Sequence, residues 1–258
     1  MRIDIRANAA RYYDLNPETL DDIGFYRDRI PFSEAKVLEL GCGTGRVLIP
    51  LLRDCGYIHG VDVSPAMIAR CQKRLSEEAI PITNAHVEVG DIAEVDLGRT
   101  FDLIIAPYRV FQNLETDSET SGFFGTVRKH LAGCGTCVLN VFKPNRDPEA
   151  LHRKWANKEE YPCWEVPIKG GRVTCHGRNA QIDQEKVIFY PELIYRTYRG
   201  NNLVDEVVLK IVMRCYYPEE FKETILKNGF EVLNCWGGYS GEHYGEGPEL
   251  AVEFRNPS

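Results

Sequence analysis

The chain has 258 residues and a formal net charge of −7, and 43% of its residues are hydrophobic, 10% aromatic and 27% charged. This composition excludes disorder, collagen and coiled coil as the main organisation, and the length predicts one large domain or a domain with an insertion. The acidic balance argues against a nucleic-acid partner. No apolar run approaches the roughly 20 residues that span a bilayer, and the charged start lacks a secretory signal, so we expect a cytoplasmic protein without membrane contact.

The nine cysteines are expected to be free thiols, because the chain carries no export signal. Cys134 and Cys137 form one close pair. A structural zinc site would need a second such pair or a histidine pair, and neither follows at a suitable spacing. We therefore expect no metal.

Strand and helix patterns alternate along the first 145 residues. A helix is expected over residues 8–30, because apolar residues recur on one face and Pro31 can end it. Helices are also expected at 46–55, after Ser64 and at 118–131. They separate short strands at 36–40, 57–62, 85–89, 101–106 and 135–142. This alternation predicts an α/β fold, a doubly wound, Rossmann-like and mostly parallel sheet.

The alternation stops after Pro144. Three longer strands are expected at 172–182, 187–198 and 206–216, and the last of them alternates as if one face were packed and the other partly wet. A helix at 218–228 and strands at 230–236 and 250–254 would then complete a seven-stranded sheet. We predict three parts: residues 1–145 with the N-terminal helices and most of the core, an antiparallel β insert at 146–216, and the completion of the core at 217–258.

A glycine-rich turn joins the first strand to its helix and would let a ligand approach the backbone closely. Asp62 ends the second strand, where a carboxylate can accept hydrogen bonds from both hydroxyls of a ribose. Arg46 stands where a dinucleotide fingerprint needs a small residue, which disfavours NAD and FAD, and the P-loop pattern is absent. A nucleoside-containing ligand is therefore expected at the switch point of the sheet.

Five motifs in this order resemble the class I S-adenosylmethionine-dependent methyltransferases, over roughly residues 35–142. They are VLELGCGTGR at 37–46, GVDVSPAM at 60–67, GDI at 90–92, FDLII at 101–105 and HLAGCG at 130–135. The resemblance implies S-adenosyl-L-methionine as the cofactor. It also implies the residues that bind it: Gly41, Gly43 and Gly45 at the methionine and ribose, Glu39 at the methionine end, Asp62 at the ribose, Val63 and Met67 around the adenine, and Asp91 and Ile92 at its amino group and ring.

Two tyrosines are expected near the cofactor. Many members of this family carry a Tyr-Asp pair in an N-terminal helix that covers the site, which implies that the ring of Tyr13 lies near the sulfonium; the alternative is a surface tyrosine of an amphipathic helix. The segment after the fourth strand reads Ala-Pro-Tyr-Arg, at 106–109. The adenine-N6 and amide-nitrogen methyltransferases have Asp/Asn-Pro-Pro-Tyr there, so this departure argues against those branches. Tyr108 still lies at the ligand-binding edge of the sheet.

A β-rich insert after the fifth strand resembles that of the amino-sugar N,N-dimethyltransferases, in which it roofs the acceptor site. The candidate catalytic residues are Tyr13, His176, Arg214 and His243, with Arg214 first because it lies on the partly wet face. A hydroxyl acceptor would need a base, for which His176 or His243 could serve, whereas an amine must arrive unprotonated. The insert could equally form the interface of a homodimer.

These observations predict transfer of a methyl group to a nitrogen or oxygen atom of a small molecule by direct in-line displacement. The enzyme mainly orients the acceptor, because the sulfonium methyl is already electrophilic. One alternative is a tRNA methyltransferase, which a basic surface around the pocket would distinguish. Another is a non-catalytic partner subunit that binds S-adenosylmethionine without turnover.

Overall fold

The computed structural model describes residues 6–78, 82–144 and 147–257, and it contains two β-sheets. The larger one, called the core sheet below, has seven strands in the order β11-β12-β5-β4-β1-β2-β3. Strands β1 to β5 run parallel, and β12 pairs antiparallel with both β5 and β11. This confirms the predicted fold class. The bounds are β1 Lys36–Leu40, β2 Tyr57–Asp62, β3 Ala85–Val89, β4 Phe101–Ala106, β5 Leu131–Phe142, β11 Glu231–Trp236 and β12 Glu249–Arg255.

Helices cover both faces of the core sheet, as its apolar strands require. Leu38, Ile104 and Leu139 pack toward α5 and α7, whereas Val37 and Leu103 pack toward α3 and α4. The helical elements of the core are α3 Leu48–Leu51, α4 Pro65–Glu77, η1 Ile82–Asn84, η2 Val110–Asn113, α5 Asp117–His130 and α7 Pro218–Lys227. Helices α3 and α4 cover one face of the core sheet and α5 and α7 cover the other, which is the doubly wound arrangement. No helix within the described ranges is long and apolar enough to cross a membrane.

The prediction of a single N-terminal helix over residues 8–30 is wrong. The structure has two short helices there, α1 Ala10–Tyr13 and α2 Ile23–Arg27. Pro17 disfavours a helical conformation for the residue before it, and the Asn16 side chain accepts a hydrogen bond from the Glu18 N–H at 3.0 Å, which stabilises a turn. The helix expected at 46–55 is likewise reduced to α3, because Leu52 and Asp54 bond to carbonyls three residues back.

The second sheet, called the insert sheet, is antiparallel and has five strands and a preceding helix, where three strands were expected. The elements are α6 Pro148–Ala156, β6 Tyr161–Ile168, β7 Gly171–Asp183, β8 Ile188–Arg199, β9 Asn202–Lys210 and β10 Met213–Arg214. The strand expected at 206–216 is divided into β9 and β10, which both pair with β8. The division falls opposite Pro191, which has no amide hydrogen for the ladder.

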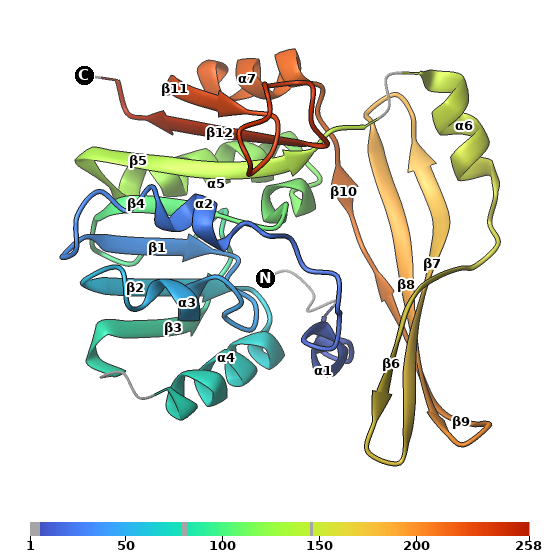
Figure 1. Ribbon diagram of the computed structural model, residues 1–258. Coiled ribbons are helices and arrows are strands. Elements are labelled where there is room, and N and C mark those ends of the chain that lie inside the picture. Colours follow the sequence, from blue (N-terminus) through green and yellow to red (C-terminus); the bar gives the residue numbers. More distant parts are fainter. Residues whose placement is uncertain (1–5, 79–81, 145–146, 258) are drawn as a thin grey trace.

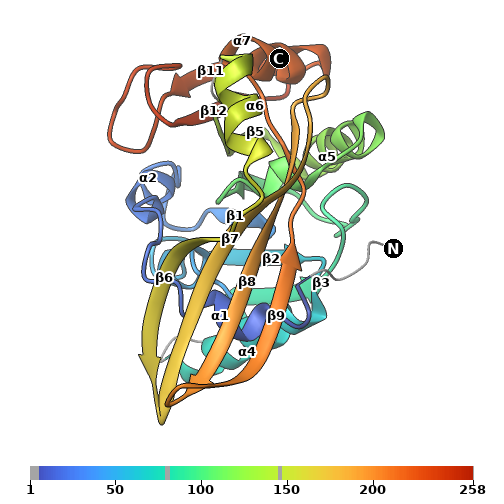
Figure 2. The ribbon, with the colours of Figure 1, turned by 90° about the vertical axis from the view of Figure 1, so that its right-hand side faces the viewer.

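The insert sheet stands beyond the carboxyl ends of the parallel strands, and α1 lies between the two sheets (Figure 1). Turned by 90°, strands β6 to β9 extend across the carboxyl edge of the core sheet (Figure 2). This places the insert opposite the edge at which doubly wound sheets bind ligands. The exact division at residues 145 and 216 stays a prediction.

Candidate active site

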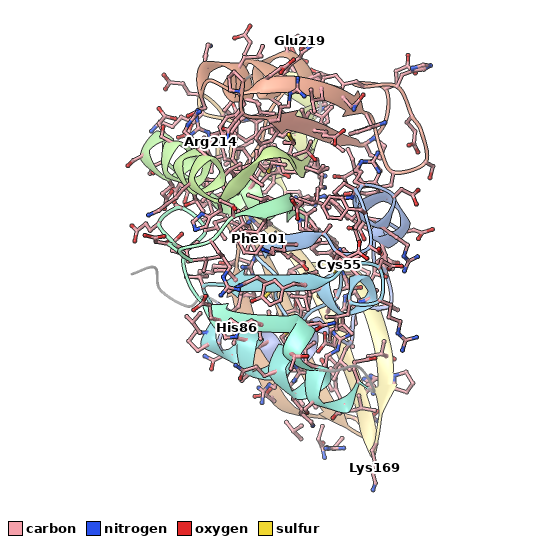
Figure 3. The ribbon with its side chains drawn as sticks, turned by 90° about the vertical axis from the view of Figure 1, so that its left-hand side faces the viewer. Cys55, His86, Phe101, Lys169, Arg214 and Glu219 are labelled. Carbon is pink, nitrogen blue, oxygen red and sulfur yellow. The ribbon has the colours of Figure 1, made fainter. Side chains whose placement is uncertain are left out.

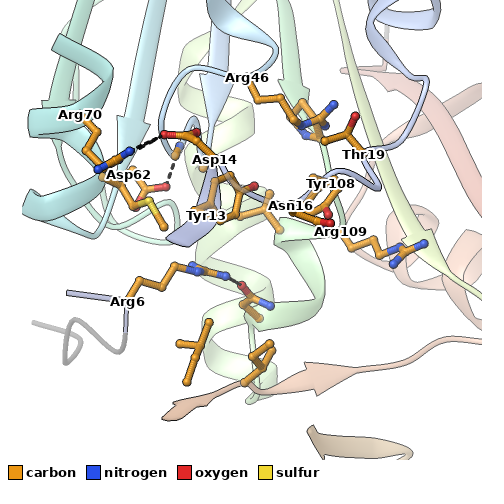
Figure 4. A pocket seen from close by; sticks show the side chains of 18 of the residues that line it. Arg6, Tyr13, Asp14, Asn16, Thr19, Arg46, Asp62, Arg70, Tyr108 and Arg109 are labelled. Atoms are coloured by element: carbon orange, nitrogen blue, oxygen red, sulfur yellow. Dashed lines mark hydrogen bonds and ion pairs between the residues drawn. The ribbon is translucent and has the colours of Figure 1, made fainter. Parts of the chain in front are cut away.

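A cavity of about 750 Å³ opens where the carboxyl ends of the core strands, α1 and the insert sheet meet (Figure 4). Gly41, Gly43 and Asp62 line it from the core sheet, and Tyr13 lines it from α1. Leu193 and Tyr195 line it from β8. One cavity therefore joins a glycine-rich half to a half formed by the insert.

The glycine turn needs its glycines, but for different reasons. Gly41, Gly43 and Gly45 have φ values of 82°, 54° and 82°, in the left-handed region that side chains disfavour. A Cβ atom at Gly41 would lie 2.2 Å from Cγ2 of Val110, whereas one at Gly43 would meet no atom within 4 Å. Gly45 does not line the cavity; it faces Cys71 and Ile49, so it serves the packing of the turn on α3 and α4.

Asp62 is positioned by the backbone on either side of it. Its Oδ2 accepts a hydrogen bond from the Gly43 N–H and its Oδ1 accepts one from the Ser64 N–H, each at 2.9 Å. The carboxylate is 5% exposed and lines the cavity beside Met67, which is 1% exposed. The spacing that suggested a ribose site thus places Asp62 directly against the glycine turn.

Glu39 lies behind the turn and does not line the cavity. The side chain is 3% exposed, and its Oε2 has no hydrogen-bond partner among the described residues. Burial raises the pKa of Glu39 well above its usual range. The role expected for Glu39 at the methionine end therefore stays a prediction.

Arg46 provides an anchor that the sequence did not reveal. Its Nη1 and Nη2 donate to Oδ1 and Oδ2 of the fully buried Asp22, at 2.6 and 2.8 Å. The guanidinium also lies 4.8 Å from the centre of the Tyr108 ring. This bidentate pair ties the turn to the start of α2 and supports Tyr108, which lines the cavity and whose contact with a cofactor stays a prediction.

Three residues implied by the resemblance lie outside the cavity lining. Val63 follows Asp62 but is not among the lining residues. Asp91 accepts a hydrogen bond from the Ala93 N–H at 3.0 Å, and Ile92 is buried in the core on the α5 side. Their contacts with an adenine stay predictions.

The residues of α1 close the cavity over the glycine turn. The ring of Tyr13 lies 6.3 Å from that of Tyr108 in an edge-to-face arrangement, and burial raises the pKa of Tyr13 to about 12. Asp14 accepts hydrogen bonds from Thr44 Oγ1 at 2.6 Å and from Arg70 Nη2 at 3.0 Å. Tyr13 thus faces the cavity, and Asp14 holds α1 to the glycine turn and to α4.

The insert side of the cavity is mainly apolar. Leu193 and Tyr195 alternate along β8, and three further residues alternate in the segment from β9 to β10: Leu209, Ile211 and Met213. Tyr195 also stacks on Tyr12 of α1, with ring centres 5.0 Å apart. The face of the segment 206–216 that was predicted to be packed is therefore the face that lines the cavity.

The other candidate catalytic residues lie elsewhere. Arg214 pairs with Asp117 at 2.7 Å and does not line the cavity. His176 pairs with Ile194 in the β7–β8 ladder, so its side chain lies on the opposite sheet face from Tyr195. His243 is exposed in the loop before β12. Their catalytic roles stay predictions without a supporting contact, whereas Tyr13 lies in the cavity.

Gly43→Ala should weaken binding of S-adenosylhomocysteine about tenfold, or roughly 1.4 kcal/mol. Gly43 lines the cavity and a Cβ atom there meets no protein atom within 4 Å, so the added methyl group would take up space that we expect the ligand to fill. Gly98 is a matched control, since it has a φ of 60°, open space around its Cβ position and no place in the cavity lining. Both variants should lose similar stability in thermal unfolding. Calorimetry showing equal affinity in the two variants would contradict the prediction that the cofactor binds at the glycine turn.

The fold is Rossmann-like, and an inserted β-sheet forms one wall of the cavity at the carboxyl edge of the core sheet. Residues 37–135 match a family model described as a methyltransferase domain. These residues, which include the glycine turn and Asp62, therefore form a methyltransferase domain, the class that the sequence motifs resemble.

Two similar proteins are named as methyltransferases of amino sugars. The chain is 25% identical over 146 residues to the dTDP-3-amino-3,4,6-trideoxy-alpha-D-glucopyranose N,N-dimethyltransferase of Streptomyces venezuelae, which is 57% of either chain. It is 27% identical over 132 residues to the dTDP-4-amino-2,3,4,6-tetradeoxy-D-glucose N,N-dimethyltransferase of Saccharopolyspora spinosa, or 51% of this chain and 50% of that one. The chain thus spans about half the length of these relatives.

Similarity of fold extends over almost the whole chain. The structure of the CcbJ methyltransferase from Streptomyces caelestis matches with a TM-score of 0.79 and 18% identity, over 99% of this chain and 98% of that one. At this identity the match concerns the fold alone, and it includes both the core and the inserted sheet.

Proposed function

We propose that this protein transfers a methyl group from S-adenosylmethionine to the amino group of a small molecule. The observation that carries the proposal is the single cavity that joins the Gly43–Asp62 turn to the apolar wall of the insert. A cofactor at the turn would have its reactive end near an acceptor on the insert side. Holding the two reactants together in the right orientation in one cavity is the main contribution that such an enzyme makes.

The residues at the turn suit this cofactor. Asp62 offers carboxylate oxygens at the end of β2, Gly41 and Gly43 let a ligand approach the backbone, and Met67 supplies an apolar surface. When bound, S-adenosylmethionine supplies an electrophilic methyl group on a sulfonium. The ring of Tyr13 faces the same cavity and offers a π-surface to a cation.

The polar groups of the cavity favour an amine acceptor over a hydroxyl. No histidine stands among the described residues that line the cavity. Burial raises the pKa of both Tyr13 and Tyr195, so both phenols stay protonated at neutral pH and neither is present as a phenolate base. Asp14 and Asp62 are held by hydrogen bonds within the protein. An acceptor that arrives as a neutral amine brings its own lone pair and needs no base for the attack.

The test compares acceptors that differ at one atom. A dTDP-linked amino sugar, its hydroxyl analogue and bulk tRNA are each incubated with the protein and S-adenosylmethionine, and methylated products are measured by mass spectrometry. We expect methylation of the amine alone, with a rate that rises with pH as the ammonium form is lost. Methylation of the hydroxyl sugar would overturn the amine assignment, and methylation of tRNA would overturn the small-molecule assignment.

Three further expectations stay predictions. A cofactor-binding protein without turnover would bind S-adenosylhomocysteine but methylate none of these compounds. A homodimer would most simply use the insert sheet, where Leu203 and Val204 of β9 are 50% and 54% exposed. The cytoplasmic location rests on the sequence alone.

A further inference from the structure

A group of metal-ligating side chains gathers at the β3 edge of the core sheet, away from the cavity. The parallel register places His59 of β2 opposite His86 of β3, and Glu88 follows two residues after His86. Residues two apart in a strand point to the same face, so all three side chains share one face of the sheet. Figure 3 labels His86 on this outer strand. None of the three lines the cavity.

Their donor atoms converge. Nε2 of His59 lies 2.8 Å from Oε1 of Glu88, and one donor atom from each of the three residues lies within 4.8 Å of the others. Nδ1 of His59 is 3.2 Å from the hydroxyl of Tyr57. His59 is 4% exposed, whereas His86 is exposed and the Glu88 side chain is 43% exposed. The group thus has a rigid buried member and an open side toward solvent.

We propose that His59, His86 and Glu88 bind one divalent transition-metal ion, for which zinc is the best fit. Two imidazole nitrogens and one carboxylate oxygen are a ligand set that zinc accepts, with water in the remaining position. A histidine that binds metal through one ring nitrogen usually donates a hydrogen bond from the other. The Tyr57 hydroxyl is placed to accept that bond from Nδ1 of His59.

Binding of zinc requires only small movements, and the exposed side chains of His86 and Glu88 can make them. Ligand atoms in a tetrahedral zinc site with bonds of 2.0–2.1 Å are about 3.3 Å apart, between the 2.8 Å and 4.8 Å found here. Rotation of the exposed His86 and Glu88 side chains can equalise these distances while His59 stays in place. Arg99 opposes the ion through its charge, but its guanidinium lies over the Tyr57 ring, 5.3 Å from the centre.

A bound ion would tie β3 to β2. Strand β3 is the edge of the core sheet and pairs only with β2 among the described strands. An ion held by both strands binds the folded chain and not the unfolded one, so it raises the unfolding temperature. This effect is independent of methyl transfer, because the three ligands lie outside the cavity.

The test is calorimetric titration of the apo-protein with zinc chloride, with Cys134→Ser in every variant because that thiol is exposed. We expect one ion per chain, and at least tenfold weaker binding in both His86→Ala and Glu88→Gln. His152→Ala is the control, since this exposed histidine of α6 lies outside the cluster, and its affinity for zinc should be unchanged.

A second measurement separates metal binding from misfolding. All variants should bind S-adenosylhomocysteine alike, and saturating zinc should raise the unfolding temperature of the Cys134→Ser protein but not of the protein that also carries His86→Ala. Zinc binding that is not saturable, or that has the same affinity with and without His86, would overturn the proposal. An equal thermal shift in both proteins would do so as well.

Discussion

Asp62→Asn should weaken binding of S-adenosylhomocysteine by tenfold or more. Replacing the carboxylate by an amide removes the charge from the acceptor and turns one oxygen into a donor. Hydrogen bonds to a charged group contribute about 1.5–3 kcal/mol each, and about 1.4 kcal/mol corresponds to tenfold in affinity. Isothermal titration calorimetry measures the effect directly.

The same substitution touches the turn itself, because Oδ2 of Asp62 accepts a hydrogen bond from the Gly43 N–H. Thermal unfolding of the variant therefore accompanies the titration. Glu94→Gln is the control for loss of a carboxylate, since Glu94 is exposed and lies outside the cavity lining. Unchanged affinity in a folded Asp62→Asn protein would rule out the ribose assignment.

Ile211→Trp should lower kcat/KM for the amino-sugar acceptor by about a hundredfold, the order of loss that follows a displacement of about 1 Å at a reacting centre. Ile211 lines the cavity on the insert side, between β9 and β10. A larger ring there takes up acceptor space but leaves the glycine turn untouched. Affinity for S-adenosylhomocysteine should stay within about twofold. Steady-state kinetics and calorimetry on the same preparation separate the two effects.

Val208→Trp is the matched control for this enlargement. Val208 lies on β9, is 40% exposed and does not line the cavity. Its variant should retain both turnover and cofactor affinity. If both tryptophan variants lose turnover equally, the loss comes from the insert as a whole and not from the cavity wall.

The glycine-rich half of the cavity could be predicted from the sequence because local geometry determines it. Glycines with positive φ and a carboxylate at the next strand end leave a pattern within some 20 residues, and Gly41, Gly43 and Asp62 all reach the cavity. The pattern of β1 to β5 was equally readable, since buried parallel strands are short and apolar. Gly45 shows the limit, because a glycine needed for packing looks the same in sequence as one needed for a ligand.

The half of the cavity that the insert forms could not be predicted in the same way. Its wall consists of apolar side chains such as Leu193 and Tyr195, whose sequence pattern is that of any packed strand. Polar residues were chosen as candidates for their chemistry, but Arg214 forms an ion pair with Asp117, and His176 lies on the face of the insert sheet opposite to Tyr195. Which face of the insert sheet turns toward the core depends on contacts with α1, a segment nearly 200 residues away in the chain.

Helix α1 is attached to the two sheets by bonds of different physical character. On the core side, Asp14 pairs with Arg70 on a partly exposed surface; on the insert side, Arg11 pairs with Asp205 at the surface and the ring of Tyr12 is also buried against Tyr195. Salt screens the ion pairs on both sides and leaves the stacking of Tyr12 on Tyr195 nearly unaffected. Rising ionic strength should therefore loosen α1 from the glycine turn more than from the insert sheet, where the aromatic stacking remains. A cofactor bound at the turn would then exchange on the core side of α1, while Leu193 and Tyr195 keep their places in the cavity wall.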